Sequence, residues 1–211
     1  MRVIAIDGPA GSGKSTVARR LAAVLELDYL DTGAMYRSVA FAALRRGVDP
    51  EDTQPVGALA RSMELELDAD GTVHVDGADA TIEIRGPEVT RAVSLVAANP
   101  EVREEMRLRQ REWAESHGGG VIEGRDIGSV VFPDAELKVY LDAQPEVRAQ
   151  RRSREVEDLA YETVAADLAR RDAMDQGRAT DPLQRTEDSV VIDTTDLGID
   201  QIVAMIEEQL G

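Results

Sequence analysis

One short string near the start of the chain constrains its fold more than any other feature. Residues 8–15 read Gly-Pro-Ala-Gly-Ser-Gly-Lys-Ser and match the P-loop pattern G-x-x-x-x-G-K-[ST]. They follow an apolar run at residues 3–7 and precede a segment with apolar residues at helical spacing. The residues of that helical face are Val17, Leu21, Val24 and Leu25. This strand–loop–helix context is what the motif requires, and it separates the string from a glycine-rich turn that matches by chance.

The chemistry of this loop predicts a bound polyphosphate. Glycines let backbone N–H groups close around a phosphate, and the N-terminus of the following helix adds a favourable dipole. The ammonium of Lys14 can reach the β- and γ-phosphates, and the hydroxyl of Ser15 can bind Mg²⁺. We therefore expect a nucleoside triphosphate site with the following residues: Gly8, Pro9, Ala10, Gly11, Ser12, Gly13, Lys14, Ser15 and Thr16.

Five short apolar runs, each ending in acidic or polar residues, predict a parallel sheet. They lie at residues 3–7, 29–31, 121–126, 137–142 and 190–193, and segments with helical period lie between them. Near-continuous apolar runs of this length suit strands that are buried on both faces. Alternating strands and helices imply right-handed crossovers, so we expect a P-loop NTPase-like α/β fold, a five-stranded parallel sheet flanked by helices. Ligands of such sheets bind beyond the carboxyl ends of the strands.

Two stretches interrupt this alternation. Residues 63–84 alternate polar and apolar side chains, with turns at Asp70-Gly71 and Asp76-Gly77, which predicts a small antiparallel β insertion. Residues 148–178 are highly charged, and their apolar residues, Leu159 among them, are sparse. Such a stretch is typical of a solvated helical pair, but a mobile cover over a phosphate site would have the same composition.

The charge balance and the absence of cysteine narrow the function classes. The net charge of −17 argues against a general nucleic-acid binder, whereas a small phosphorylated ligand needs only a few cations focused in a cleft. Without cysteine the chain has no disulfide framework, thiolate metal site or thiol nucleophile. No targeting segment or long apolar run is visible, so we expect a cytoplasmic, monomeric protein with no membrane or nucleic-acid partner.

Three further strings carry polar groups suited to a phosphorylated ligand. Residues 31–37 (Asp-Thr-Gly-Ala-Met-Tyr-Arg) end the second run, and their arginine can grip a phosphate from the first helical turn. Residues 123–128 (Glu-Gly-Arg-Asp-Ile-Gly) end the strand expected beside the P-loop strand. Residues 171–178 place three charged side chains on one helical face: Arg171, Asp175 and Arg178. Taken singly, each string also fits a structural ion pair or a solvated charge.

Together these strings resemble the bacterial-type cytidylate kinases. The resemblance runs along the whole chain, through the P-loop and residues 31–37, 108–111, 124–128, 131–135 and 171–183. It implies transfer of the γ-phosphoryl group of ATP to the 5′-phosphate of CMP or dCMP, with Mg²⁺ as the cofactor. Two departures from the family pattern are Ser129, where threonine is usual, and Gln176-Gly177, which replaces a Ser-Thr pair.

The resemblance also implies a role for each site residue. The catalytic side chains are Lys14, Arg37, Arg125 and Arg178, and the three arginines hold the acceptor phosphate. Arg171 and Asp175 lie near the ribose, and the other CMP-binding residues are Thr32, Ser94, Arg103 and Asp126. Arg148, Arg151 and Arg152 are alternatives for an arginine that closes over the donor, and the sequence does not choose among them.

Recognition of cytosine falls to Ser94, Arg103 and Asp126 under this resemblance, and the chemistry of the base edge supports it. The exocyclic amine of cytosine donates hydrogen bonds, whereas its N3 and O2 accept them. A carboxylate facing the amine therefore prefers cytosine to uracil, whose O4 would meet that carboxylate. A buried mismatch of this type costs a few kcal/mol because polar groups are left unpaired.

We expect three parts along the chain. Residues 1–33, 102–147 and 166–211 form the P-loop core, residues 34–101 a nucleoside monophosphate-binding region with the β insertion, and residues 148–165 a helical lid. Two rival functions stand beside the first: another kinase of the same fold, acting on a different nucleotide or small molecule, and a GTP-driven switch. The switch would need Asn-Lys-x-Asp to recognise guanine, but Leu137 precedes the one lysine outside the P-loop, Lys138.

Overall fold

The computed structural model describes residues 1–68, 70–155 and 160–211. Its contacts divide the chain into two compact units. Unit 1 comprises Met1–Leu30 and His117–Gly211, and unit 2 comprises Asp31–Ser116. The three-part division into core, nucleotide-binding region and lid stays a prediction. Ala69 of the insertion and residues 156–159 of the lid, which include Leu159, lie outside the described residues.

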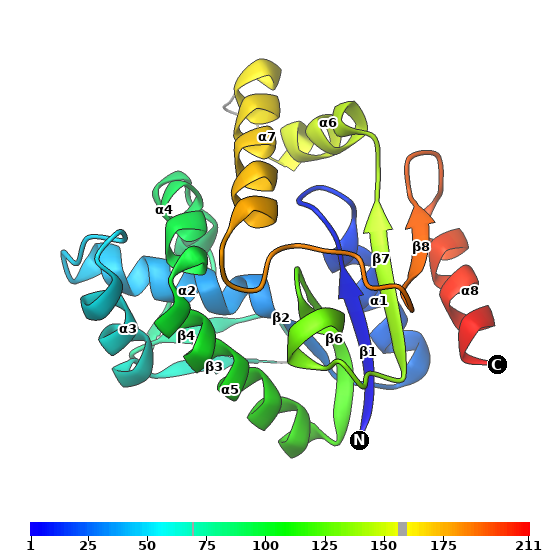
Figure 1. Ribbon diagram of the computed structural model, residues 1–211, viewed down its shortest axis with the longest axis horizontal. Coiled ribbons are helices and arrows are strands. Elements are labelled where there is room, and N and C mark those ends of the chain that lie inside the picture. The colour runs from blue at the N-terminus through cyan, green and yellow to red at the C-terminus, as the bar shows by residue number, and fades with distance from the viewer. Residues whose placement is uncertain (69, 156–159) are drawn as a thin grey trace. The chain divides into compact units, whose positions relative to one another are not determined.

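A five-stranded sheet with the order β2-β6-β1-β7-β8 forms the centre of unit 1 (Figure 1). Its strands are β1 (Arg2–Asp7), β2 (Tyr29–Asp31), β6 (Gly119–Gly124), β7 (Leu137–Asp142) and β8 (Val190–Asp193). β1 pairs in parallel with both β6 and β7, and β7 pairs in parallel with β8. The predicted P-loop fold is confirmed. The strand before the loop is central, and the strand before Arg125 lies next to it, as expected.

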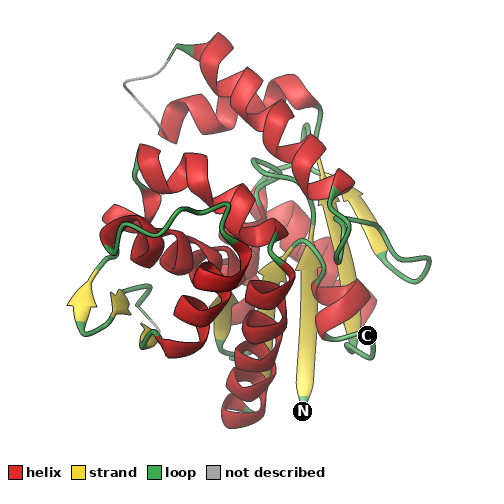
Figure 2. Ribbon diagram, turned by 60° about the vertical axis from the view of Figure 1, so that its left-hand side comes forward, coloured by secondary structure: helices red, strands yellow, loops and turns green. Residues whose placement is uncertain are grey.

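Helices α1 (Lys14–Leu25) and α8 (Ile199–Leu210) pack against each other and against this sheet. The strands of the sheet run side by side in Figure 2. An aliphatic cluster of unit 1 joins side chains of the strands to those of the two helices: Ile4, Ile6, Val17, Ala18, Leu21, Ala22, Val121, Val139, Leu141, Ile192, Ile202, Val203 and Ile206. Its burial holds α1, and therefore the loop that precedes α1, against the carboxyl ends of the strands.

The charged stretch at 148–178 forms a helical pair, α6 (Pro145–Glu155) and α7 (Tyr161–Gly177). Three of its few apolar residues, Ala149, Val164 and Leu168, form a buried cluster with Ala10 of the P-loop. The pair is therefore anchored to the loop by a small apolar contact, while most of its surface is charged. Between β6 and β7 the chain forms a π-helix, η2 (Ile127–Val131), which the sequence did not predict.

Unit 2 is a helical layer with a small sheet. Its helical elements are α2 (Thr32–Arg45), α3 (Thr53–Ser62), η1 (Glu83–Arg85), α4 (Pro87–Ala98) and α5 (Pro100–His117, whose last residue belongs to unit 1). α2 packs against α3, η1 and α4. Asn99 separates α4 from α5, and its Oδ1 accepts hydrogen bonds from the amides of Glu101 and Val102 at 3.0 and 3.4 Å. These bonds satisfy donors that the first turn of a helix otherwise leaves without an acceptor.

The predicted antiparallel insertion is present in unit 2 as a sheet of β3 (Leu65–Leu67), β4 (Val73–Val75) and β5 (Ala78–Asp79). Val75 pairs with Ala78, so Asp76 and Gly77 form a two-residue hairpin loop. Their φ angles of 51° and 74° are those of a type I′ turn, in which glycine and aspartate are favoured because both central residues need positive φ.

The predicted apolar face of α1 needs one correction. Val17 and Leu21 are buried, but Val24 is 39% exposed. The helix ends one residue later, at Leu25, and Glu26 takes a left-handed conformation with φ 53°. Leu25 still packs against the buried cluster, so Val24 lies at the edge of the buried face of α1.

We expect Leu21→Ala to lower the free energy of unfolding by about 2–5 kcal/mol, because it removes a fully buried side chain from the cluster of α1, α8 and the sheet. Val24→Ala is the matched control on the same helix and should change stability by less than about 1 kcal/mol. Urea denaturation followed by circular dichroism measures both. Equal losses for the two variants would contradict this description of the core.

Candidate functional site

The P-loop connects β1 to α1 through a backbone with positive φ at Gly8, Gly11 and Gly13, which favours glycine at each. A Cβ on Gly8 would lie 2.0 Å from the carbonyl oxygen of Leu141 on β7. Gly13 is the N-cap of α1 and has a φ of 90°, in the left-handed region. The turn is therefore tight, and α1 starts at Lys14 with the N–H groups of its first turn directed at the loop.

Lys14 is buried at the first position of α1. Its Nζ donates a 2.7 Å hydrogen bond to the carbonyl oxygen of Pro9, so the ammonium lies inside the curve of the loop. Burial, together with the neighbouring guanidinium of Arg125, lowers the pKa of Lys14 to about 7, although Glu123 and Asp7 act in the opposite direction. A phosphate group bound in the loop would place negative charge beside this ammonium and so raise the pKa of Lys14.

The hydroxyls of Ser15 and Thr16 are exposed on the first turn of α1. Across residues 1–68, 70–155 and 160–211, no group of three or more His, Cys, Asp or Glu side chains is arranged to hold a metal ion. The exposed position of Ser15 on the first turn of α1 fits a magnesium ion that its hydroxyl would hold together with phosphate oxygens and water, a common arrangement for Mg²⁺.

Unit 1 brings four of the predicted acceptor residues together in two ion pairs. Nε of Arg125 lies 2.9 Å from Oδ2 of Asp175, and an N–H of Arg178 lies 3.4 Å from Oδ1 of Asp126. The side chains of the second pair are 4% and 6% exposed, so both charges are almost out of water. Burial alone would lower the pKa of Arg125, but the adjacent Asp175 carboxylate raises it overall. These arginines are held charged in a buried setting where an anion binds more strongly than it does in water.

Arg171, on α7, is the fifth predicted residue of this group. Its buried Nε has no hydrogen-bond partner among the residues that the structure describes. Burial and the nearby Arg125 lower the pKa of Arg171 to about 10, against the effect of Asp175. A buried donor without an acceptor costs about 1–3 kcal/mol, which favours a role in which a ligand supplies the acceptor.

Unit 2 holds the other predicted acceptor residues. Thr32 and Arg37 lie on α2, where Arg37 donates to the carbonyl oxygen of Ile84 at 3.2 Å and to Oγ1 of Thr90 at 3.0 Å. Buried Ser94 lies on α4. Arg103 on α5 is fully buried, and its guanidinium donates to the carbonyl oxygen of Ala97 at 3.2 Å.

The ring of Tyr36 also contacts Arg103. The guanidinium carbon lies 5.4 Å from the ring centroid, a cation–π distance. Together with the contacts to Ile84 and Thr90, this packing fixes the direction of two arginines before any ligand binds. Preorganisation of this kind lowers the entropy that ligand binding would otherwise cost.

Comparison with known proteins connects these two groups of residues to one family. A family model described as cytidylate kinase matches residues 4–210. The cytidylate kinase of Pelotomaculum thermopropionicum is 49% identical, and the match covers 96% of this chain and 93% of that protein. The cytidylate kinase of Geobacillus kaustophilus is also 49% identical, with 97% and 94% covered. This chain belongs to the cytidylate kinase family. The family predicted from the sequence strings is confirmed.

Solved structures share the fold at lower sequence similarity. TT1252 from Thermus thermophilus aligns over all of this chain and 98% of its own with a TM-score of 0.52 and 19% identity. Shikimate kinase from Acinetobacter baumannii aligns over all of this chain and 93% of its own with a TM-score of 0.50 and 18% identity. Similarity at this level establishes the α/β fold of this cytidylate kinase family member and nothing about its substrate.

The sequence did not choose among the arginines of α6 as the one that closes over the donor, and in the structure they make different contacts. Buried Arg148 donates to the carbonyl oxygens of Ala143 and Ala10, both at 3.1 Å, and pairs with Asp172 at 2.5 Å. It therefore ties α6 to the P-loop and to α7. The spacing of charges could not show this, because every arginine in a charged helix has the same local signature.

Arg151 is a second arginine of α6 that anchors the helix, through a different contact. It donates to Oγ1 and to the carbonyl oxygen of Thr194, at 2.9 and 2.6 Å. The hydroxyl of Thr194 in turn donates to the carbonyl oxygen of Ser12 at 3.0 Å, which links β8 to the P-loop. Sequence reasoning missed Thr194. Its one signal was its position directly after the acidic end of a predicted strand.

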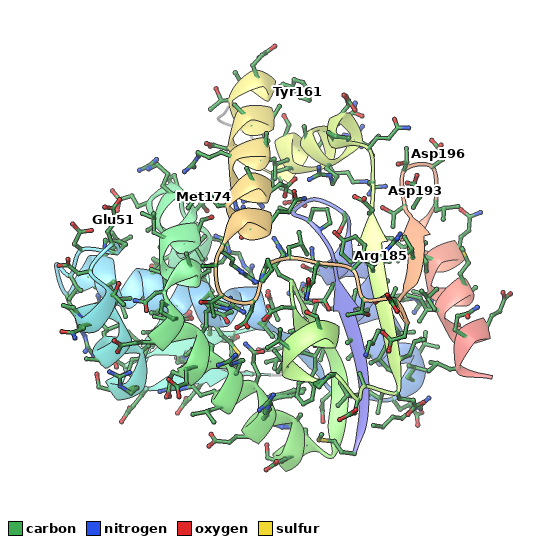
Figure 3. All side chains as sticks on the ribbon, viewed as in Figure 1. Glu51, Tyr161, Met174, Arg185, Asp193 and Asp196 are labelled. Carbon is green, nitrogen blue, oxygen red and sulfur yellow. The ribbon has the colours of Figure 1, made fainter. Side chains whose placement is uncertain are left out.

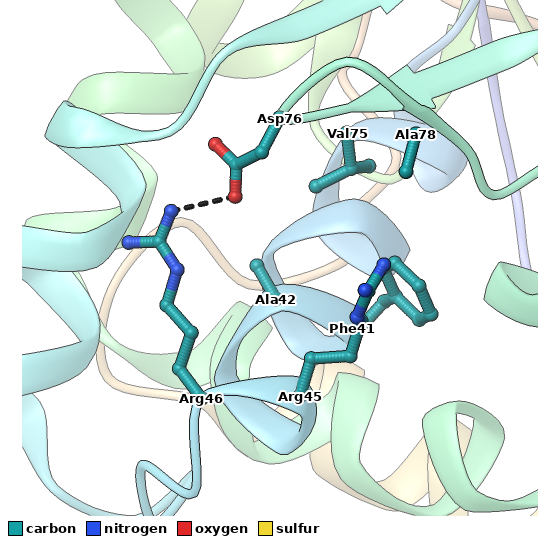
Figure 4. Close-up of a pocket in the computed structure, with 7 residues that line it drawn as sticks. All are labelled: Phe41, Ala42, Arg45, Arg46, Val75, Asp76 and Ala78. Atoms are coloured by element: carbon teal, nitrogen blue, oxygen red, sulfur yellow. Dashed lines mark hydrogen bonds and ion pairs between the residues drawn. The ribbon is translucent and has the colours of Figure 1, made fainter.

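One cavity in unit 2 lies apart from the predicted site residues. It has a volume of about 280 Å³ and opens between the C-terminal half of α2 and the β4–β5 hairpin, where Arg46 pairs with Asp76 (Figure 4). Thr32 and Arg37 lie in the N-terminal half of the same helix and do not line the cavity.

No helix in the described part of the chain combines the length and the apolar composition that a bilayer crossing needs.

We expect Lys14 to titrate near pH 7 in the free protein and at least one unit higher when ATP is bound, because the phosphates supply negative charge beside it. Lysine labelled with ¹³C at Cε gives signals from only Lys14 and Lys138, and Lys14→Gln assigns them. The ¹³C shift followed from pH 5.5 to 10.5 measures each midpoint. A Lys14 midpoint that stays near 10 without ATP, or does not rise with ATP, would contradict the burial described above.

Proposed function

We propose that this chain transfers the γ-phosphoryl group of ATP to the 5′-phosphate of CMP or dCMP and releases ADP with CDP or dCDP. The observation that carries the proposal is the family match over residues 4–210, because it includes the P-loop and every string predicted to bind the acceptor. The geometry of unit 1 supports it with a P-loop at the end of β1 and paired arginines beyond β6.

The reaction needs little acid or base chemistry from the protein. The acceptor phosphate is already a nucleophile, so catalysis consists of holding donor and acceptor in line and of neutralising charge on the transferring group. In this proposal Lys14 neutralises the donor phosphates from inside the loop. Mg²⁺, held by Ser15 with phosphates and water, supplies further charge neutralisation when it is bound.

We assign the acceptor phosphate to Arg37, Arg125 and Arg178, and the ribose to Arg171 and Asp175, with Thr32 as a further contact to the same nucleotide. The carboxylates that pair with Arg125 and Arg178 would be exchanged in part for phosphate oxygens. The ion pairs therefore keep the arginines oriented and charged until the acceptor arrives, which limits the reorganisation needed during the reaction.

The base is assigned to Ser94, Arg103 and Asp126. Asp126 accepts from the exocyclic amine of cytosine in this proposal, and the guanidinium of Arg103 faces the acceptors N3 and O2. Both side chains are buried, so a base with the wrong donor pattern would leave polar groups unpaired out of water. Residence in the cytoplasm and a monomeric state remain predictions.

The substrate is tested by ADP release with ATP and each of CMP, dCMP, UMP, AMP and GMP. We expect kcat/KM for CMP and dCMP to exceed the values for the other nucleotides by about tenfold or more, as a buried hydrogen-bond mismatch implies. Shikimate and gluconate serve as acceptors for the rival small-molecule kinases. Turnover of UMP, AMP, GMP, shikimate or gluconate above that of CMP would contradict the proposal, as would ADP release that does not depend on any acceptor.

Asp126→Ala should lower the ratio of kcat/KM for CMP to that for UMP by about tenfold, since it removes the group that accepts from the cytosine amine. Asp134→Ala, which changes an exposed aspartate after η2, is the control and should leave the ratio unchanged. An unchanged ratio in Asp126→Ala would show that another residue reads the base.

Arg178→Ala should lower kcat/KM for CMP by roughly 10²-fold, because the acceptor phosphate loses a buried cation. Arg170→Ala is the matched control, since Arg170 is an exposed arginine of α7 that pairs with Asp167 at 3.2 Å. Steady-state kinetics at saturating ATP measures both. Full activity of Arg178→Ala would remove this residue from the acceptor site.

A further inference from the structure

The carboxylate of Asp7 has no part in the proposed chemistry, yet it is buried at the end of β1, directly before Gly8 of the P-loop. Its side chain reaches across to the segment that follows β6. Oδ1 accepts a hydrogen bond from the amide of Ile127 at 2.9 Å, and Oδ2 accepts one from the amide of Gly128 at 2.8 Å. Both oxygens are therefore used, one on each of two consecutive amides.

These two amides begin the π-helix η2. The helix is closed by i→i+5 bonds, from the amide of Val131 to the carbonyl oxygen of Asp126 at 3.2 Å and from the amide of Phe132 to that of Ile127 at 2.7 Å. A π-helix is rare and frequently marks a functional site. Here the N–H groups of its first two residues have no partner within η2, and Asp7 supplies both acceptors.

Two anchors therefore enclose Arg125 and Asp126. On one side, Gly124 is held by the parallel pairing of β6 with β1, in which it lies opposite Asp7 itself. On the other side, Ile127 and Gly128 are held by the Asp7 carboxylate. Only two residues lie between the anchors, so one side chain at the P-loop strand fixes the backbone of both.

A second contact limits how far η2 can move. A Cβ on Gly128 would lie 3.0 Å from Cγ of Lys138, so the side chain of Lys138 packs against this backbone. Nζ of Lys138 is itself held 2.6 Å from Oδ2 of Asp188. The start of η2 thus lies between the Asp7 carboxylate and an aliphatic stem that is tied at its far end.

We propose that Asp7 is a positioning residue, which sets Arg125 and Asp126 in register with the P-loop and so couples the donor site to recognition of the acceptor. The inference rests on the proposed function above, in which these two residues bind CMP. It adds a residue that touches neither nucleotide and acts through two backbone hydrogen bonds.

Protonation of Asp7 gives a way to weaken this coupling without a mutation. Burial raises the pKa of Asp7 to about 6, an effect larger than the lowering by the amides of Gly128 and Ile127. The charged and titratable groups that face it are Asp126, Lys14 and Tyr140. Because the pKa is raised, the carboxylate is ionised above about pH 6 and gains a proton below it. The neutral carboxyl then keeps one good acceptor, its carbonyl oxygen, whereas its O–H oxygen accepts only weakly from an amide.

Asp7→Asn tests the hydrogen bonds directly, because the amide group keeps the shape of the side chain but replaces one acceptor by a donor. We expect hydrogen exchange of the Ile127 or Gly128 amide, measured by NMR at pH 7.5, to become faster by on the order of tenfold, the value of about one hydrogen bond. Asp193→Asn is the matched control. Asp193 lies at the carboxyl end of β8 (Figure 3), is exposed, and its Oδ1 accepts from the amide of Thr195 at 2.9 Å. Asp193→Asn should leave the hydrogen exchange of the Ile127 and Gly128 amides unchanged.

A second readout separates positioning from simple stability. The ratio of kcat/KM for CMP to that for UMP is measured from pH 5.5 to 8, and the titration of the acceptor phosphate cancels because both nucleotides carry it. For the wild type we expect the ratio to fall by about threefold or more below pH 6, and for Asp7→Asn we expect a low ratio that no longer changes with pH. Asp193→Asn should follow the wild type.

Each outcome decides the proposal. Unchanged amide exchange in Asp7→Asn would overturn it, as would faster exchange with a wild-type ratio and pH profile, since Asp7 would then be structural only. If Asp7→Asn does not fold, the pH dependence of the wild-type ratio decides alone. If Asp126→Ala shows that Asp126 does not set this ratio, the base-reading part of the proposed function has failed. The amide exchange then still decides whether Asp7 holds the segment.

Discussion

Burial of charged side chains at the carboxyl ends of β1 and β6 is the constraint on which the rest of unit 1 depends. Lys14 lies inside the P-loop with its Nζ on the carbonyl oxygen of Pro9, and Asp7 lies under the start of η2. Charges taken out of water are costly unless each meets a partner. The tight turn at Gly8, the π-helix and the pairing of Arg125 with Asp175 all serve to supply such partners. Burial itself is the main cause that moves the pKa values of Lys14 and Asp7 toward neutrality.

Features that depend on local sequence could be predicted. The strands follow from apolar runs, and the P-loop follows from a string whose glycines have one physical use. The hairpin at Asp76-Gly77 follows from a turn type that needs positive φ at both positions. Of the three charges predicted on one helical face, α7 carries Arg171 and Asp175. The prediction was wrong for Arg178, which follows the last residue of α7 in an extended conformation because the helix ends at Gly177.

Features that depend on contacts distant in sequence could not be predicted. The π-helix at Ile127–Val131 forms where Asp7, remote along the chain, accepts its first two amides. Arg148 could not be told from Arg151 or Arg152, since burial against Ala10 and Asp172 is a tertiary property. The exposure of Val24 reflects which side of α1 the sheet and α8 cover, and the apolar pattern of the helix alone did not show where that buried face ends. The predicted roles of the site residues toward nucleotide remain predictions for the same reason.

The central claim is that unit 1 reads the acceptor nucleotide with charged side chains that are already held in place. A crystal structure of the protein with CMP tests it most directly. The account predicts that a carboxylate oxygen of Asp126 lies within hydrogen-bond distance of the exocyclic amine of cytosine and that Arg125 and Arg178 contact the 5′-phosphate. It also predicts that Asp7 still accepts from the amides of Ile127 and Gly128. A base bound away from Asp126, or a phosphate with neither arginine beside it, would contradict the account.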